Sequence, residues 1–152
     1  MRQTLTTALM ALTLAWPAMA ADTPSLVDRW RDDPGQVFDA EDIDIAELQW
    51  IARPVIVFAN SPNDPAFEDQ MAEIAEGLAD LIERDVIVII DTDAATPSVL
   101  RNKLRPRGFM LVLMGKDGQV KLRKPLPWTV RELSRSIDKM PMRQREIGRE
   151  RR

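Results

Sequence analysis

The hydrophobic positions of the chain form short continuous runs that predict buried β-strands. Three such runs lie at residues 55–59 (VIVFA), 86–90 (VIVII) and 109–114 (FMLVLM), and the first two are rich in β-branched side chains. Continuous apolar runs of this length are typical of strands that are covered on both faces. A fourth run, at residues 119–124 (QVKLRK), alternates apolar with basic side chains after an Asp-Gly turn. It predicts an edge strand that a hairpin joins to the third run.

Longer stretches with apolar residues at helical spacing complete the pattern. Residues 67–82 carry one apolar stripe, which predicts a continuous helix with Asp64 as its cap and Pro65 as its first residue. A second helix is predicted to begin at a Thr96 cap, and a third follows the capping box that opens at Thr129. The order β-α-β-α-β-β-α predicts an α/β domain with the three-layer, thioredoxin-like arrangement.

The two ends of the chain differ from this core. Residues 1–20 (MRQTLTTALMALTLAWPAMA) predict a secretory signal peptide that is removed after Ala20, and hence export to the periplasm or the cell exterior. Residues 21–36 are an acidic lead-in, expected to pack back onto the core as irregular structure with short helical turns. We assign the folded domain to residues 37–143. Residues 144–152 predict a basic, flexible tail because they hold four arginines and only one large apolar side chain.

Composition narrows the chemistry that is open to this chain. Its 152 residues carry a net charge of −3 and include neither cysteine nor histidine. Thiol catalysis, a Ser-His-Asp triad and metal sites built from thiolate or imidazole are therefore excluded. A general nucleic-acid binder is excluded as well, because it needs a basic surface. We expect no cofactor and no metal centre.

Four segments of the chain carry a family resemblance. They are LQWIARPVIVFANS (48–61), ERDVIVI (83–89), GKDGQVKLRK (115–124) and IDKMPMRQREI (137–147). Over residues 37–147 the chain resembles the bacterial family of domain of unknown function 4174, and the Met-Pro-Met-Arg stretch ending at Arg143 is the most specific element. The resemblance implies a thioredoxin-like fold and export, with related domains in vertebrate extracellular proteins of the sushi-repeat-containing group. The family has no established activity, so it implies no catalytic residue.

A second resemblance concerns residues 107–118 (RGFMLVLMGKDG), which are similar to the Arg-Gly-x-Phe-Ile-Ile-Asp stretch of peroxiredoxins. There the arginine helps to activate peroxide, a role that would fall to Arg107. The peroxidatic cysteine would lie near Pro65 or Ala66, where this chain has none. The alternative reading of Arg107 is a loop-surface arginine.

The loop after the first predicted strand is the main candidate binding surface. Asn60, Ser61, Asn63 and Asp64 lie at the carboxyl end of a central strand and before a helix, where open α/β sheets bind ligands. The alternative is that these residues make only turn and cap hydrogen bonds. Because Asp64 places negative charge there, the loop favours a neutral ligand or a peptide over an anion.

Other polar residues have simpler expected roles. Asp91 and Asp93 are expected to be solvated carboxylates or helix caps, since their surroundings lack the calcium-loop pattern. Arg143 is expected to pair with a carboxylate of its own domain. Trp50 and Trp128 are expected to pack against the core.

These observations predict an exported, cysteine-free, non-redox protein that binds an unidentified protein or small molecule, or serves as an accessory module. Two alternatives stay open. One is an enzyme of unrecognised type that uses the loop at 60–65 with Arg107. The other is an envelope-associated structural protein, held by weak contact between its basic tail and an anionic membrane surface.

Overall fold

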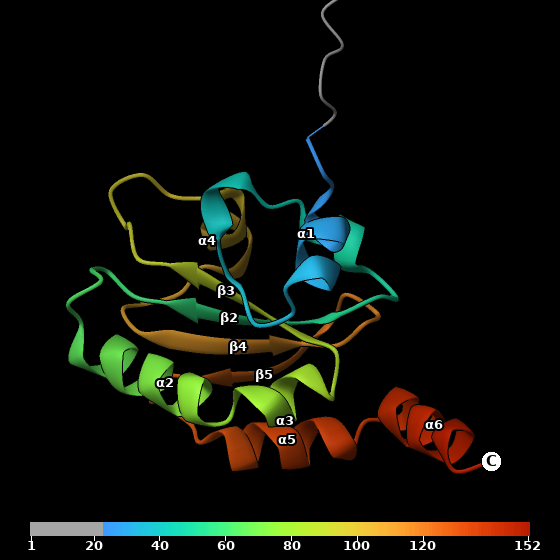
Figure 1. The fold of residues 1–152 in the computed structure, drawn as a ribbon. Coiled ribbons are helices and arrows are strands. Elements are labelled where there is room, and N and C mark those ends of the chain that lie inside the picture. Colours follow the sequence, from blue (N-terminus) through green and yellow to red (C-terminus); the bar gives the residue numbers. More distant parts are fainter. Residues whose placement is uncertain (1–22) are drawn as a thin grey trace, which may run out of the picture.

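A computed structural model describes residues 23–152, which form a five-stranded sheet between two layers of helices (Figure 1). The predicted signal peptide lies outside these residues. The strands are β1 (Val37–Asp39), β2 (Arg53–Phe58), β3 (Val86–Asp91), β4 (Met110–Met114) and β5 (Val120–Lys124). Their order across the sheet is β1-β3-β2-β4-β5, with β2 parallel to β3, and with β4 antiparallel to both β2 and β5. The four predicted strands, their hairpin and the α/β class are confirmed.

The first strand was not predicted, because only three residues form it and only Phe38 is buried. It pairs in parallel with β3 and brings the lead-in onto the sheet. Helix α1 (Leu26–Asp32) buries Leu26, Val27 and Trp30 just before it. The expectation that this part of the chain packs back onto the core is therefore confirmed.

Helices and 3-10 turns cover the sheet on both sides. Besides α1 they are η1 (Ala40–Asp42), η2 (Ile45–Leu48), α2 (Pro65–Glu76), α3 (Leu78–Ile82), α4 (Val99–Leu104), α5 (Val130–Asp138) and α6 (Pro141–Glu150). Figure 1 shows α1 and α4 on one side of the sheet, α2, α3 and α5 on the other, and α6 beyond the end of α5. Among the described residues, no helix has the length and apolar character needed to cross a bilayer.

The alternation of side chains along β2 divides the core into two clusters. Ile56 and Phe58 pack with residues of α1, η2 and α4, whereas Val55 and Val57 pack with residues of α2, α3 and α5. All four side chains are fully buried. Burial of one such side chain contributes about 1.5–3 kcal/mol, so the central strands hold the two helical layers together.

The long helix predicted for residues 67–82 is divided in two at Gly77. A Cβ atom at this position would lie 2.5 Å from Cβ of Val130, at the start of α5. The absence of a side chain lets the two segments approach closely, and the backbone leaves the helix there. The predicted single helix is therefore wrong at this residue, although its cap at Asp64 and its start at Pro65 are confirmed.

One other helix start differs from expectation, and one agrees with it. The cap of α4 is Ser98, whose hydroxyl accepts a hydrogen bond from the Arg101 N–H, and not Thr96. The Thr96 N–H donates instead to the carboxylate of Asp93. The capping box at Thr129 is present as predicted, with both reciprocal hydrogen bonds to Glu132.

The last residues form a helix where a flexible tail was predicted. Helix α6 begins at Pro141 and continues through Glu150. Composition suggested too little apolar surface for an ordered segment, but Arg143 is buried and Glu146 is half-buried. Charged contacts with the rest of the domain therefore hold this helix.

Trp50 lies outside the core, contrary to expectation, and 63% of its surface is exposed. Its backbone has a φ of 66°, in the left-handed region that non-glycine residues rarely adopt. The Trp50 N–H donates to the carbonyl oxygen of Lys116 at 2.6 Å, which fixes this conformation. Trp128 is half-buried and packs against the cluster beneath α5.

Candidate functional site

The loop at residues 60–64 directs its polar groups toward its own backbone. One carboxylate oxygen of Asp64 accepts hydrogen bonds from the N–H groups of Ala66 at 2.9 Å and Phe67 at 3.4 Å. The hydroxyl of Ser61 accepts from the N–H of Asn63 at 3.1 Å. These are the turn and cap contacts of the simpler reading, and they occupy the N-terminus of α2. Asn60 and Asn63 are exposed.

Arg107 lies at the same end of the sheet as this loop. The pairing of Met110 with Phe58 places the start of β4 beside the carboxyl end of β2. Arg107 is exposed and has no hydrogen bond or ion pair with another residue of the described chain. The structure therefore brings Arg107 and the loop to one edge without joining their side chains. A catalytic use of this edge stays a prediction.

A buried ion pair closes the space between the ends of β2 and β3. Arg101 donates to the Asp91 carboxylate from Nε at 2.9 Å and from an Nη at 2.6 Å. The same Nη also donates to the carbonyl oxygen of Ala59 at 2.7 Å, and the Ser98 hydroxyl donates to Asp91 at 2.6 Å. The guanidinium lies 5.5 Å from the ring centre of Phe58. The prediction of a solvated Asp91 is wrong, because only 4% of this residue is exposed.

Asp93 is exposed, as expected of a solvated carboxylate, but it stabilises a turn and is not a helix cap, because the cap of α4 is Ser98. Its carboxylate accepts from the N–H groups of Ala95 at 2.8 Å and Thr96 at 3.2 Å. These hydrogen bonds lower the pKa of Asp93 below its ordinary value. The carboxylates of Asp91 and Asp93, at the carboxyl end of β3, thus stabilise the loop that leads to α4. Among residues 23–152, no group of three or more acidic side chains is arranged to hold a metal ion.

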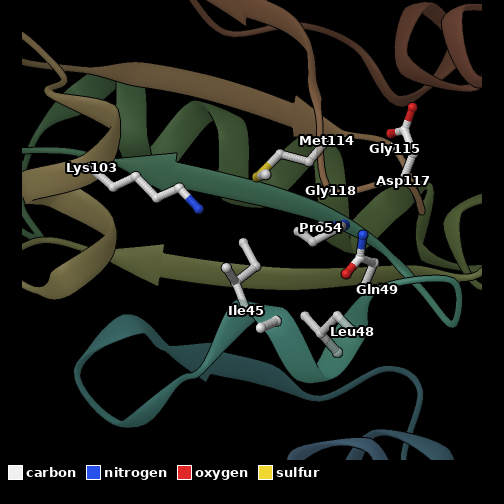
Figure 2. Close-up of a pocket in the computed structure, with 10 residues that line it drawn as sticks. Ile45, Leu48, Gln49, Pro54, Lys103, Met114, Gly115, Asp117 and Gly118 are labelled. Carbon is white, nitrogen blue, oxygen red and sulfur yellow. The ribbon is translucent and has the colours of Figure 1, made fainter.

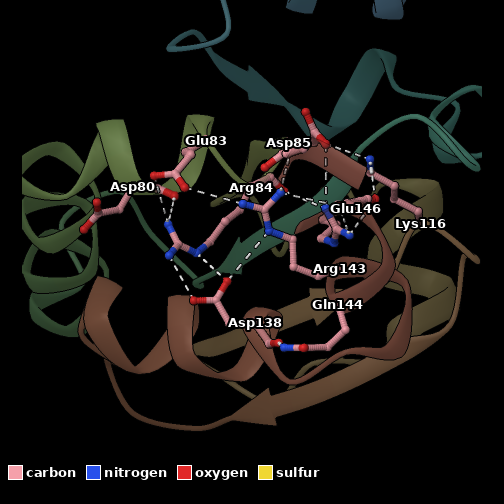
Figure 3. A network of polar contacts seen from close by, with 11 residues as sticks. Asp80, Glu83, Arg84, Asp85, Lys116, Asp138, Arg143, Gln144 and Glu146 are labelled. Carbon is pink, nitrogen blue, oxygen red and sulfur yellow. Dashed lines mark hydrogen bonds and ion pairs between the residues drawn. The ribbon is translucent and has the colours of Figure 1, made fainter. Parts of the chain in front are cut away.

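The opposite end of the sheet carries a larger network of charges, shown in part in Figure 3. Arg53 at the start of β2 is fully buried, and its guanidinium donates to the Glu146 carboxylate of α6 at 2.9 Å and 3.0 Å. Lys116 lies 3.0 Å from Glu146 and 2.7 Å from Asp85. Glu146 therefore joins α6 to β2 and to the turn after β4.

The pKa of Glu146 reflects this position. Burial raises it, but the hydrogen bonds and charges of Lys116 and Arg53 outweigh burial and hold the pKa below its ordinary value. The carboxylate is consequently ionised at neutral pH and stays ionised to a lower pH than an unpaired glutamate would. A buried guanidinium without such a partner would be costly, which makes Glu146 essential to the docking of α6.

Arg143 is the predicted site residue at this end, and its expected pairing is confirmed. Only 3% of Arg143 is exposed, and its guanidinium lies 3.5–3.8 Å from the carboxylates of four residues, Glu83, Asp138, Glu146 and Glu150. Nearby, Arg84 donates to both oxygens of Asp138 at 2.9 Å, and this hydrogen bonding raises its pKa. The side-chain amide of Gln144 also donates to the backbone of Asp138. Arg143 and these contacts therefore fix α6 against α5 and the turn before β3.

This network unites the four segments on which the family resemblance depends. Each segment supplies at least one charged member: Arg53 from 48–61, Arg84 from 83–89, Lys116 from 115–124 and Arg143 from 137–147. All four segments thus contribute to the place where α6 docks, whereas only the first of them reaches the loop of 60–64, through Asn60 and Ser61.

A groove lies between Trp50 and the exposed side of α6. Its lining is Trp50, Lys116, Met142, Arg145, Glu146 and Arg149, around a volume of about 390 Å³. A neighbouring hollow of about 200 Å³ shares Lys116, Met142 and Arg145 and adds Met140 and Pro141. Arg145 and Arg149 are exposed and form no ion pair within residues 23–152. We call the two hollows together the Trp50–α6 groove.

A separate cleft lies between η2 and the sheet (Figure 2). Ile45 and Leu48 face Pro54 and Met114 across a volume of about 210 Å³. Lys103 is the basic residue of its lining, and the carboxylate of Asp117 is engaged by Lys121 at 2.6 Å. That hydrogen bond lowers the pKa of Asp117. The cleft therefore presents an apolar wall and one amine, without a pair of groups suited to acid–base catalysis.

Sequence reasoning missed the Trp50–α6 groove because it placed Trp50 in the core and the last residues in a flexible tail. One signal was available, since Met142, Arg145 and Arg149 recur at helical spacing after Pro141. The positive φ of Trp50 has no comparable sequence signal, because a glycine or asparagine is usual there.

Comparisons with known proteins agree with this architecture. A reduced 2-Cys peroxiredoxin from Plasmodium vivax superposes with a TM-score of 0.54 at 12% identity, over 68% of this chain and 85% of that one. This match shows the thioredoxin-like fold that the sequence predicted. No curated protein sequence matches the chain. The model of the family described as domain of unknown function (DUF4174) matches residues 44–146, within the 37–147 expected from the resemblance. The chain belongs to this family.

Proposed function

We propose that this protein is an exported, non-redox binding module that contacts its partner through the Trp50–α6 groove. The observation that carries the proposal is the contrast between the two ends of the sheet. At the carboxyl end, Asp64, Ser61 and the Asp91–Arg101 pair satisfy one another or the backbone. At the other end, the groove leaves a tryptophan and two arginines exposed.

The non-redox part of the proposal rests on composition. A thioredoxin-like scaffold performs thiol chemistry only with a thiolate, and this chain has no cysteine. We expect background rates in insulin-reduction and thiol-peroxidase assays with the purified protein. A rate above background would contradict the proposal.

Export is supported by the N-terminal sequence alone. Cleavage after Ala20 would give a protein that begins at Ala21, which N-terminal sequencing of the secreted product can read directly. A mature protein that retains Met1 would contradict export without bearing on the groove.

The groove itself is tested with two matched double variants. Arg145→Glu/Arg149→Glu reverses the exposed charges of the groove, whereas Arg131→Glu/Arg135→Glu makes the same change of net charge at two exposed residues one turn apart on α5. In a pull-down from the native compartment, we expect proteins captured by the wild type to be kept by the second variant and lost by the first. Equal capture by both variants would contradict a groove-centred function.

A further inference from the structure

The Trp50–α6 groove combines an exposed aromatic side chain with two exposed arginines that have no ion pair within residues 23–152. One rim is Trp50, held outward by a left-handed backbone and 63% exposed. The other rim is α6, where Arg145 and Arg149 lie one turn apart on the same face. Between the rims lie Met142 and the aliphatic stem of Lys116. An observed backbone outlier at an exposed aromatic residue is a reason to look for function there.

The exposed charges of the groove favour a negatively charged ligand. Its deeper cations are engaged, because Arg53 and Lys116 contact Glu146 and Lys121 contacts Asp117. Arg145 and Arg149 are left without an ion pair in the described chain. They lie on a protein whose net charge is −3, so this surface attracts an anion that the rest of the molecule repels.

The shape of the groove favours an extended ligand over a flat surface. The two hollows, of about 390 and 200 Å³, meet at Lys116, Met142 and Arg145. A flat bilayer would touch the rims and leave these hollows empty, whereas an extended chain can place successive side chains into each. Methionines at the centre suit apolar side chains of different shapes, because the thioether is flexible and polarisable.

We propose that the Trp50–α6 groove binds an extended acidic peptide segment of another protein, with large apolar side chains seated beside Trp50 and the methionines. The carboxylates of the segment pair with Arg145 and Arg149, and its apolar side chains fill the two hollows. This inference rests on the proposed function, because it names the kind of partner that the binding module recognises.

The direct test is binding of a fluorescein-labelled peptide of alternating glutamate and leucine to the purified protein, followed by fluorescence anisotropy. We expect saturable binding that weakens as salt is raised. A peptide with lysine in place of glutamate and one with glycine in place of leucine should both bind at least about tenfold more weakly, since each lacks one of the two contacts.

Protein variants locate the site. Arg145→Glu/Arg149→Glu should weaken binding by about tenfold or more, while Arg131→Glu/Arg135→Glu on α5 should bind like the wild type. Trp50→Gly should also weaken binding, although glycine is the residue best suited to its positive φ. The emission of the wild-type protein should shift to the blue when unlabelled peptide binds, and Trp50→Gly should lose that shift.

Three results would overturn the inference. They are no saturable binding of the glutamate–leucine peptide, equal binding by both double variants, or groove-dependent binding of anionic phosphatidylglycerol vesicles in place of the peptide. In the last case the groove would recognise a lipid surface. If the pull-down still showed a groove-dependent partner, the proposed function would stand and only the peptide chemistry would be wrong.

Discussion

At the scale of single residues, the burial of charged side chains was the feature that the sequence could not predict. Asp91 is the last residue of β3 and lies two positions before Asp93, a pattern usually found on a solvent-exposed surface. It is nevertheless buried and paired with Arg101. No local spacing reveals the pair, because Arg101 lies in a later helix that only the folded chain brings to β3. The burial of Arg53 could not be predicted either, because its partner Glu146 is 93 positions away in the sequence.

The Asp91–Arg101 pair gives the first prediction. Asp91→Ala leaves a buried guanidinium without its counter-ion, so the free energy of unfolding should fall by about 3–5 kcal/mol. Replacing both residues, as Asp91→Leu/Arg101→Met, removes the unpaired charge and should restore much of that loss. Urea denaturation of the three proteins measures both effects. A single variant as stable as the wild type would place Asp91 in solvent after all.

At the scale of elements, most starts and ends followed local rules that the sequence displays. The Asp64 cap, Pro65 start and Thr129 capping box are local contacts, and each was predicted correctly. The predictions failed where a residue far away in the sequence determines where a helix ends or whether it forms. The helix break at Gly77 depends on Val130, and α6 is ordered through Glu146. The periodicity of apolar residues cannot predict contacts between segments that are far apart in the chain.

Gly77 gives the second prediction. Alanine favours helix over glycine by about 1 kcal/mol, so Gly77→Ala would be stabilising if the break were a matter of propensity. Its Cβ would instead lie 2.5 Å from Val130, and overpacking of this kind costs about 1–3 kcal/mol. We therefore expect a lower melting temperature. Combining Gly77→Ala with Val130→Gly, which removes every Val130 atom in the clash, should cost less than the sum of the two single changes. Simple additivity would argue against the clash.

The contact of α6 with the sheet depends on pH through Glu146. Its pKa is lower in the folded state than its ordinary value of about 4.3, so the stability it contributes is complete above that value. This contribution is lost as pH falls through the lowered folded-state pKa. Glu146→Gln should be less stable than the wild type at pH 7 by about 1.5–3 kcal/mol, the usual worth of a hydrogen bond to a charged group.

The same variant should lose less stability than the wild type as the pH falls from about 5 to 3, since it has no carboxylate to protonate at this position. Denaturant unfolding at a series of pH values measures the difference between the two proteins. A difference that stays constant over this range would show that protonation of Glu146 does not control the contact.

At the scale of the whole molecule, the pattern of apolar runs was sufficient for the class of fold and for four of the five strands. It was insufficient for the surfaces that bear on function. The candidate residues of the loop at 60–64 and Arg107 lie at one end of the sheet, and Arg143 lies at the other, within the network that docks α6. The sequence could suggest these residues but could not show that they belong to opposite ends.

The two sides of α6 have separable roles, which gives the last prediction. Its inner side holds Arg143 and Glu146 against the domain, whereas Arg145 and Arg149 are exposed. Deleting residues 144–152 removes the partner of Arg53, so the free energy of unfolding should fall by roughly 1.5–3 kcal/mol. Arg145→Glu/Arg149→Glu should keep the melting temperature of the wild type within a few degrees, because exposed charges contribute little to stability.

If the deletion left the melting temperature unchanged, the network would not hold the helix and the flexible tail predicted from composition would be correct. If the double variant instead unfolded with the deletion, the outer face would be part of the fold and could not serve as a free binding surface.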